Sequence, residues 1–323
     1  MPFSSEELVW ATEVVGRAMP PTPQYLWPLL ADKVGAEVWV KHENHTPTAA
    51  FKVRGGLVYV ERMRTERPAV EGTVSATRGN HGQSLAFAGR AAGVPVTIVV
   101  PEGNSPDKNA AMTGFGAELV VHGHDFQAAR EHAAVLGAER GLEVVPSYHP
   151  DLVLGVATYA LELFSAVAEL DAVYVPVGMG TGICGLIGVR DLLGLSTEVI
   201  GVVADEAPAT ALSVAAGRVV TTDAANTFVD GVACRVPDED AISIICGGAA
   251  RILRVSEDAA AEAMRVLFAC THNVAEPAGA LAVAGLLQER SWVSGKKVVV
   301  IHTGGNADAD MLAMVLAGST PRI

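Results

Sequence analysis

The sequence is poor in cysteine, in aromatic residues and in positive charge. Its four cysteines, Cys184, Cys234, Cys246 and Cys270, include no CxxC pair and have no histidines at zinc-finger spacing. Neither a disulfide framework nor a zinc site is therefore indicated. The 23 Lys and Arg against 36 Asp and Glu give a formal net charge of −13. Because no basic surface is available to hold a phosphate backbone, we expect no nucleic-acid partner.

Long apolar runs are also missing. The first ten residues, MPFSSEELVW, are acidic and lack the basic start and apolar stretch of an export signal. Nowhere do about 18 apolar residues follow one another without interruption. We expect a cytoplasmic protein with reduced cysteines and no membrane partner.

What the sequence does have is a repeated alternation of short β-branched runs with segments of helical spacing. The runs are EVWVKHE, TVSAT, VTIVVP, ELVVHG, AVYVPVG, EVIGVVAD and KVVVIHTGG. This alternation predicts an α/β fold with open, mainly parallel twisted sheets and helices on both faces. The segment EVVPSYHP, residues 143–150, interrupts it and indicates two lobes. Ligands of such sheets bind at the carboxyl ends of the strands, so the turns after the strands are the places to search.

The first of these turns is TAAFKVRGG, which contains Lys52. Helical spacing follows Lys52, and we expect Thr48 to act as the N-cap, which places the lysine in the first turn. Gly55 and Gly56 would each cost a helix roughly 1 kcal/mol relative to alanine, so they indicate close approach of another backbone or a ligand. Lys52 is then either an exposed lysine near packing glycines or an amine whose pKa is lowered beside Phe51 for Schiff-base chemistry.

The second turn, SATRGNHGQ, leads from a strand into a helix. Free N–H groups at such a helix start, together with the Asn80 amide, suit a carboxylate ligand. The alternative is structural, with Asn80 capping the helix and Gly79 permitting the turn. We expect His81 to be a capping or satisfied polar residue rather than a general base.

The third turn, VPVGMGTGICG, has glycines directly after a strand, which suits a phosphate. Read from Gly180 it is also GxGxxG, and Asp205 ends the next strand. A nicotinamide-dependent oxidoreductase is therefore an alternative, although it leaves Lys52 and Asn80 unexplained. In the fourth turn, HTGGN, Thr303 either hydrogen-bonds a ring nitrogen of a ligand or caps the last helix.

Taken in order, these turns resemble the fold type II pyridoxal phosphate (PLP) enzymes, most closely the serine/threonine dehydratases. The resemblance rests on TP at residues 22–23, KHENHTPTAAFKVRGG, SATRGNHGQ, VPVGMGTGICG, DGVAC, EPAGA and HTGGN. It covers almost the whole chain. It implies a tryptophan synthase β-like fold, a larger cofactor-binding domain of residues 1–52 and 148–323, a smaller substrate-side domain of residues 53–147, and a homodimer.

The resemblance also implies roles for single residues. Lys52 would form the Schiff base with PLP and act as the catalytic base, Phe51 would pack by the ring, Asn80 would contact the 3-hydroxyl and Thr303 would face the pyridine nitrogen. The phosphate would be held by the main-chain amides of Gly178, Met179, Gly180, Thr181 and Gly182. The substrate would be bound by Thr77, Arg78, Gly79, Asn80 and His81. Glu276, in EPAGA, matches a position near the cofactor and receives no definite role.

Several residues depart from the family pattern. Ala49 and Ala50 replace a frequent Gly-Ser pair, and Met179 and Thr181 interrupt the usual run of glycines. Arg78 stands where relatives that racemise serine have a serine, so racemisation is not expected. The carboxylates that bind a divalent cation in those relatives are replaced by Val203 and Ala209. We therefore expect no metal.

The implied reaction is dehydration of a β-hydroxy-α-amino acid to a 2-oxo acid and ammonia. The substrate is of the serine or threonine type, with 3-hydroxyaspartate and phenylserine left open. Arg78 either pairs with a second substrate carboxylate or points to solvent. A β-replacement enzyme of the cysteine synthase type and a non-enzymatic PLP carrier remain alternatives.

Overall fold

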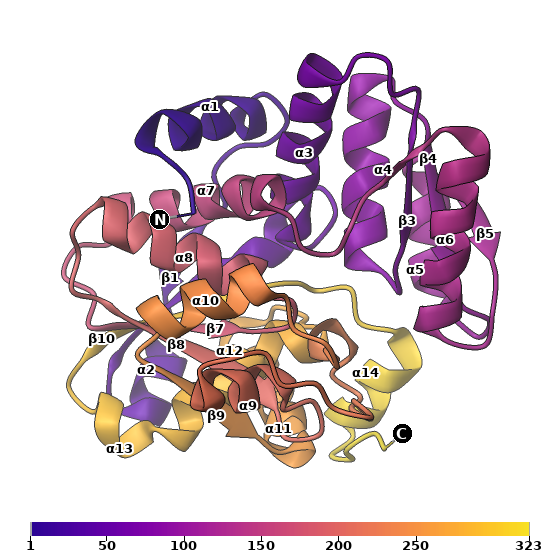
Figure 1. Cartoon of the computed structure of the whole chain (residues 1–323). Coiled ribbons are helices and arrows are strands. Elements are labelled where there is room, and N and C mark those ends of the chain that lie inside the picture. Colours follow the sequence, from indigo (N-terminus) through magenta and orange to yellow (C-terminus); the bar gives the residue numbers. More distant parts are fainter. Residues whose placement is uncertain (1, 323) are drawn as a thin grey trace.

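The computed structural model describes residues 2–322, and their strands form two separate sheets (Figure 1). The six-stranded sheet has, in spatial order, β1 (Gln24–Leu26), β2 (Glu37–His42), β10 (Lys297–His302), β7 (Ala172–Pro176), β8 (Glu198–Ala204) and β9 (Arg251–Val255). The four-stranded sheet has β5 (Glu118–Val121), β4 (Val96–Val100), β3 (Thr73–Ala76) and β6 (Glu143–Val144). Only β1 pairs antiparallel among the strands of residues 2–322, so the expected mainly parallel α/β fold is confirmed.

The seven strand-forming runs of the sequence are all strands in the structure. The additional strands β1, β6 and β9 did not stand out because they are short or carry charge, as in RILRV of β9. Their neighbours in the sheets, rather than their own composition, determine their extended conformation.

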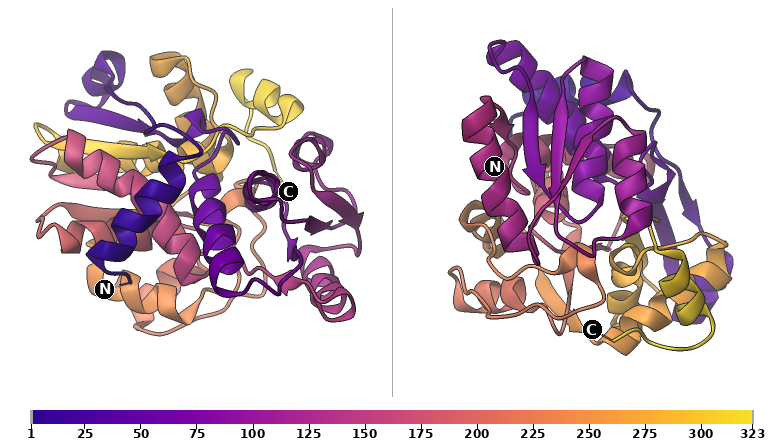
Figure 2. Two further views of the ribbon diagram at one scale, coloured as in Figure 1. Left: turned by 90° about the horizontal axis from the view of Figure 1, so that it is seen from above. Right: turned by 90° about the vertical axis from the view of Figure 1, so that its right-hand side faces the viewer.

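Helices cover both faces of the sheets (Figures 1 and 2). In chain order they are α1 (Ser5–Gly16), α2 (Pro28–Val34), α3 (Lys52–Glu66), α4 (Asn80–Ala92), α5 (Pro106–Gly114), α6 (Phe126–Arg140), α7 (Pro150–Ala166), α8 (Thr181–Leu192), α9 (Ala209–Ala216), α10 (Glu239–Gly248), α11 (Glu257–Thr271), α12 (Pro277–Gln288), α13 (Arg290–Val293) and α14 (Ala309–Leu316). A short 3-10 helix, η1 (Glu43–His45), follows β2, and a second one, η2 (Asp230–Val232), precedes α10. None of the helices from residue 2 to 322 is long and apolar enough to cross a membrane.

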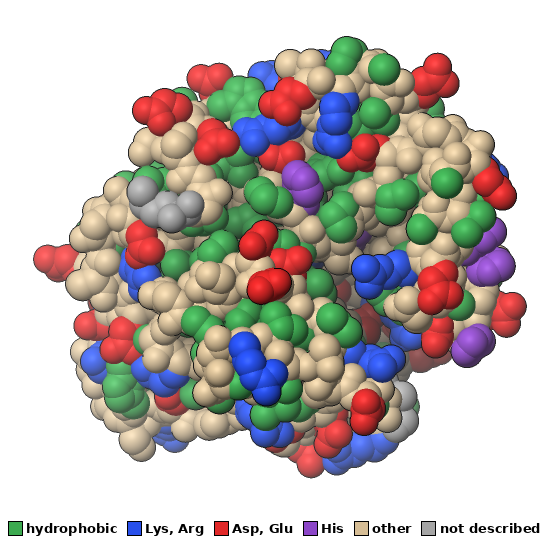
Figure 3. Space-filling model, in the orientation of Figure 1, with side chains coloured by type: hydrophobic (Ala, Val, Ile, Leu, Met, Phe, Trp, Pro, Cys, Tyr) green, Lys and Arg blue, Asp and Glu red, His purple; other side chains and the backbone are tan. Residues whose placement is uncertain are grey.

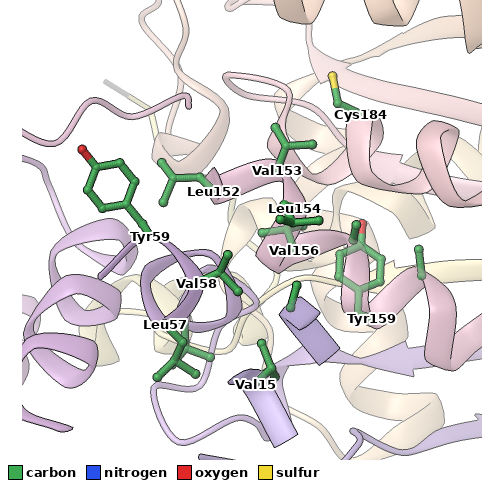
Figure 4. Close-up of a cluster of buried hydrophobic side chains, with 14 of the residues drawn as sticks. Val15, Leu57, Val58, Tyr59, Leu152, Val153, Leu154, Val156, Tyr159 and Cys184 are labelled. Atoms are coloured by element: carbon green, nitrogen blue, oxygen red, sulfur yellow. The ribbon is translucent and has the colours of Figure 1, made fainter. Parts of the chain in front are cut away.

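Successive side chains of the central strands point to opposite faces of the six-stranded sheet, and each face packs against its own hydrophobic core. Val173 and Val175 of β7 pack into a cluster with α1, α3, α4, α7 and α8, which also reaches strands of the four-stranded sheet. Figure 4 shows part of this cluster, with Val58 of α3 near Leu152 and Val156 of α7. On the opposite face, Tyr174 packs with α2, α11 and α12. The shared cluster joins the two sheets through buried helices.

Close packing of α3 explains its glycines. A Cβ on Gly56 would lie 2.3 Å from Ser84 Oγ of α4, and one on Gly55 would lie 2.9 Å from the Leu152 carbonyl oxygen of α7. The expected close approach of another backbone is thus confirmed. It fixes the start of α3, and with it Lys52, against two neighbouring helices.

The four-stranded sheet lies within residues 73–144, inside the smaller domain expected from the sequence. The boundaries at 52/53 and 147/148 stay a prediction. In both sheets the parallel strands bring their carboxyl ends to one edge, where the turns after β2, β3, β7 and β10 gather.

Candidate active site

Lys52 is the first residue of α3 and is half-buried. Its Nζ lies 3.4 Å from Thr181 Oγ1 and 5.1 Å from the centre of the Phe51 ring. Desolvation lowers the pKa of Lys52 to about 8, while the negative charge of Glu276 acts in the opposite direction. A sizeable fraction of the amine is therefore unprotonated slightly above neutral pH, as covalent chemistry requires.

Main-chain hydrogen bonds attach the Lys52 turn to the fourth turn of the sequence. Phe51 N donates to the Thr303 carbonyl oxygen at 3.0 Å, and Gly305 N donates to the Ala49 carbonyl oxygen at 2.9 Å. Ala49 adopts a φ of 52°, a left-handed conformation that alanine seldom takes. The Thr303 hydroxyl is buried and lies 3.4 Å from the Ala278 carbonyl oxygen, a weak contact that leaves it free to bind a ligand.

The glycine-rich turn between β7 and α8 offers main-chain donors beside Lys52. The N–H groups of Gly178, Met179 and Gly180 donate to no acceptor among residues 2–322. Gly180 has a φ of 100°, which only glycine adopts without strain. Tyr159 Oη donates to the Gly182 carbonyl oxygen at 3.0 Å and steadies the turn from α7. Free N–H groups at the start of α8 form a cradle for an anion.

The second turn is held by hydrogen bonds of its own. Thr77 Oγ1 accepts from Gly79 N at 3.1 Å, and Gly79 is the N-cap of α4. Asn80 Nδ2 donates to Glu276 Oε1 at 2.7 Å, and Asn80 Oδ1 accepts from Asn306 Nδ2 at 2.8 Å. Asn80 thereby connects the α4 turn to the segments before α12 and after β10.

His81 is buried, and its Nε2 has no hydrogen-bond partner among the described residues. Burial, followed by the positive charge of Lys52, lowers the pKa of His81 to about 3. The ring is therefore neutral at physiological pH and has one unpaired polar atom close to the lysine.

A cluster of charges that the sequence did not reveal surrounds Glu276. Burial, with the negative charges of Asp230 and Asp308, raises the pKa of Glu276 to about 7, while Lys108 and the hydrogen bond from Asn80 act in the opposite direction. Lys108 Nζ lies 2.5 Å from Asp230 Oδ2, and its side-chain carbons cover Gly79, where a Cβ would lie 2.9 Å from Lys108 Cδ. Asp230 and Asn306 belong to the motifs DGVAC and HTGGN of the sequence. Lys108 lies in the first turn of α5, and no motif around it indicates a role in a site.

Arg78 is exposed and lines a cavity of about 180 Å³ next to this cluster. The other lining residues are Pro101, Glu102, Gly103, Asn104, Ser105, Lys108, Asp230 and Asp308. Acidic and basic side chains gather around a hollow on the right-hand side of the molecule in Figure 3. Arg78 forms no hydrogen bond or ion pair with another of the residues described.

A family model described as "Pyridoxal-phosphate dependent enzyme" matches residues 15–304. The chain belongs to this family of pyridoxal-phosphate-dependent enzymes. It is 32% identical to the L-threo-3-hydroxyaspartate ammonia-lyase of Saccharomyces cerevisiae over 298 residues, which is 92% of this chain and 91% of that one.

Two further relatives extend the comparison. The chain is 32% identical to the biosynthetic L-threonine dehydratase of Escherichia coli over 299 residues, covering 92% of this chain and 56% of the relative. Among solved structures, the processed form of threonine deaminase isoform 2 from Solanum lycopersicum superimposes with a TM-score of 0.89 at 27% identity, covering 98% of this chain and 95% of that one. Both place the chain among fold type II PLP enzymes, and the family's cofactor is PLP.

The residues present fit this cofactor. An amine suits its aldehyde, unpaired main-chain donors suit its phosphate, and the Thr303 hydroxyl suits its ring nitrogen. The residues assigned to PLP from the sequence therefore come together around Lys52. No group of three or more His, Cys, Asp or Glu that could hold a metal occurs in the described part of the chain.

Three helix-capping interpretations were wrong, and the nicotinamide alternative loses its support. Thr48 does not cap α3, because the N-cap is Phe51 and the Thr48 hydroxyl donates instead to the Ala50 carbonyl oxygen at 3.3 Å. Asn80 does not cap α4, whose N-cap is Gly79. Thr303 does not cap the last helix either, since Asp308 occupies that position. The GxGxxG turn at Gly180 belongs to a PLP enzyme.

Proposed function

We propose that this enzyme is an ammonia-lyase that eliminates water from a β-hydroxy-α-amino acid and releases an enamine, which water then hydrolyses to a 2-oxo acid and ammonia. The observation that carries the proposal is the position of Lys52. Its Nζ faces Thr181 of the anion cradle, while the N–H of the preceding Phe51 donates to the Thr303 carbonyl oxygen. The names of the three relatives described above support the same reaction class.

When bound, PLP supplies an electron sink for the amino acid attached to it. Lys52 would hold the cofactor and, once released, remove the proton from Cα, because its pKa of about 8 allows the amine to act as a base near neutral pH. Thr303 would face the ring nitrogen with a hydroxyl, which cannot retain a ring proton as a carboxylate does. The resulting weaker electron sink favours β-elimination over transamination.

The substrate carboxylate would lie at the start of α4. The N–H groups of the first turn, from Asn80 onward, have no acceptor within the helix and carry its positive dipole end. Asn80 would direct its amide toward the 3-oxygen of the cofactor, and the neutral ring of His81 would line the site without competing for the carboxylate.

Which β-substituent is accepted follows from the cavity beside Arg78. The unpaired guanidinium of Arg78 suits a second carboxylate on the substrate, as in 3-hydroxyaspartate. The aspartates and Glu102 in the same cavity weaken the field for an anion, so threonine and serine remain candidate substrates. We further propose a homodimer in the cytoplasm, on the resemblance to the family.

The test is to compare wild type with Lys52→Ala and with Lys33→Ala, an exposed lysine in α2. Wild type and Lys33→Ala should show a visible absorption band that borohydride abolishes, with the reduced cofactor then attached to Lys52. Both proteins should release 2-oxo acid and ammonia without added thiol. Lys52→Ala should lose the band and at least about a thousandfold of the rate. Near wild-type turnover in Lys52→Ala would refute the mechanism, and a strict requirement for a thiol would favour β-replacement.

A further inference from the structure

A chain of side-chain amides leads from a main-chain carbonyl to Asn80. Asn306 Nδ2 donates to the Thr48 carbonyl oxygen at 2.9 Å and to Asn80 Oδ1 at 2.8 Å. Asn80 Nδ2 in turn donates to Glu276 Oε1 at 2.7 Å. Thr48 belongs to the turn before Lys52, so three of the site's turns contribute to one network.

The direction of these hydrogen bonds is fixed by chemistry. A main-chain carbonyl oxygen can only accept, so the Asn306 atom facing Thr48 must be the nitrogen. The same nitrogen faces Asn80, so the Asn80 atom opposite it must be the oxygen. The Asn80 nitrogen then points the other way, toward Glu276, and keeps one N–H for a ligand.

Glu276 alone could not set this direction. As a carboxylate it only accepts, but as a carboxylic acid it can also donate. Burial raises the pKa of Glu276 to about 7, so both forms occur near neutral pH. The charged groups that face it are Lys108 of α5, Asp230 of η2, Asp308 before α14 and Lys52 of α3. Asn306 fixes the orientation of the Asn80 amide, because the Thr48 carbonyl to which Asn306 is bound accepts a hydrogen bond at every pH.

We propose that Asn306 is a positioning residue that holds the Asn80 amide with its N–H toward the 3-oxygen of the cofactor, whatever the protonation state of Glu276. A donor stabilises that oxygen in its ionised form, whereas the amide oxygen in the reversed orientation would repel it. This inference rests on the contact between Asn80 and the cofactor proposed above.

Two substitutions at Asn306 distinguish a change in the orientation of the Asn80 amide from a simple loss of hydrogen bonds. In Asn306→Asp the carboxylate is repelled by the Thr48 carbonyl and accepts from Asn80 Nδ2, which turns the Asn80 amide over. PLP affinity should fall roughly ten- to a hundredfold, and the pH midpoint of the bound cofactor's visible spectrum should rise. In Asn306→Ala only Glu276 orients Asn80. The PLP affinity of the Asn306→Ala variant should be close to that of wild type at pH 8.5 and clearly weaker than that of wild type at pH 6.

The control is the same pair of substitutions in an Asn80→Ala background, with thermal unfolding measured for every variant. There Asn306→Asp should change neither PLP affinity nor the spectral midpoint further. An equal effect with and without Asn80, or equal losses at both pH values for Asn306→Ala, would overturn the proposal. If Asn80→Ala itself left PLP binding and spectrum unchanged, the Asn80–cofactor contact would be wrong, whether or not the enzyme is an ammonia-lyase.

Discussion

Lys108 Nζ lies 2.5 Å from Asp230 Oδ2, so an ion pair joins α5, which packs beside the four-stranded sheet, to the η2 segment near the anion cradle. A second link leaves the same turn of α5, where Ser105 Oγ donates to Asp308 Oδ1 at 2.5 Å. Both pairs line the cavity beside Arg78. The start of α5 is therefore held to η2 by an ion pair and to the segment before α14 by a hydrogen bond from a hydroxyl to a carboxylate.

Replacing Lys108 with Met should raise the pKa of Glu276 above its value of about 7, because the positive charge of Lys108 opposes protonation of Glu276. Carbon-13 NMR of glutamate-labelled protein would follow the carboxyl directly, with the resonance assigned by its loss in Glu276→Gln. Ser105→Ala is the matched control, since it breaks the neighbouring link without changing charge. An unchanged midpoint in Lys108→Met would show that the ammonium does not act on Glu276.

Glu276→Gln should change how stability depends on pH. The folded-state pKa of Glu276, about 7, exceeds its ordinary value of 4.5, so between these values the folded chain binds more protons than the unfolded one. The contribution of Glu276 to stability is therefore largest below pH 4.5 and is lost as the pH rises to 7.

Urea unfolding of the apo-protein would measure this effect. The unfolding free energy of wild type minus that of Glu276→Gln should fall by on the order of 2–3 kcal/mol between pH 5 and 8. His42, His81 and His302 have lowered pKa values and act in the opposite direction, but they do so in both proteins and cancel in the difference. A difference that is flat across this range would contradict the raised pKa.

Arg78→Ala should change substrate preference if the guanidinium binds a second carboxylate. Loss of a hydrogen bond to a charged group predicts a roughly ten- to hundredfold lower kcat/KM for 3-hydroxyaspartate. Threonine and serine should change by less than about threefold, since neither presents that carboxylate. Arg78→Lys keeps the positive charge but loses the forked donor, so its kcat/KM for 3-hydroxyaspartate should lie between those of wild type and Arg78→Ala. Parallel losses for all substrates would assign Arg78 to a step that they share.

The sequence was informative where a function depends on local pattern. Lys52 stood out because an amine, an aromatic ring and two glycines lie close together in the chain, and the glycines proved to pack against α4 and α7. The hydrogen-bond network through Asn306 could not be predicted from local sequence pattern. Its partners Thr48, Asn80 and Glu276 lie up to 258 residues away along the chain, and only the fold brings them together. Likewise, nothing near Lys108 announces its pairing with Asp230, which is 122 residues distant.

Arg54 supports the Lys52 turn from inside the protein. Its Nε lies 2.7 Å from Glu43 Oε2 and its guanidinium reaches Glu162 at 2.7 Å, while Lys41 Nζ lies 2.6 Å from the same Glu162. The side chains of Arg54 and Glu43 are both 0% exposed. Removing one partner of such a pair leaves an uncompensated charge in a medium that solvates it poorly.

Arg54→Met should therefore lower the free energy of unfolding by about 3–5 kcal/mol, because Glu43 stays buried without its cation. Arg17→Ala is the matched control. Arg17 also pairs with a glutamate of α3, Glu61, but its side chain is 60% exposed, so its loss should cost less than about 1 kcal/mol. Urea unfolding of the two variants decides the comparison. Since Arg54 lies two residues after Lys52, Arg54→Met should also bind PLP more weakly. Equal stability of the two variants would show that the buried network does not hold the Lys52 turn.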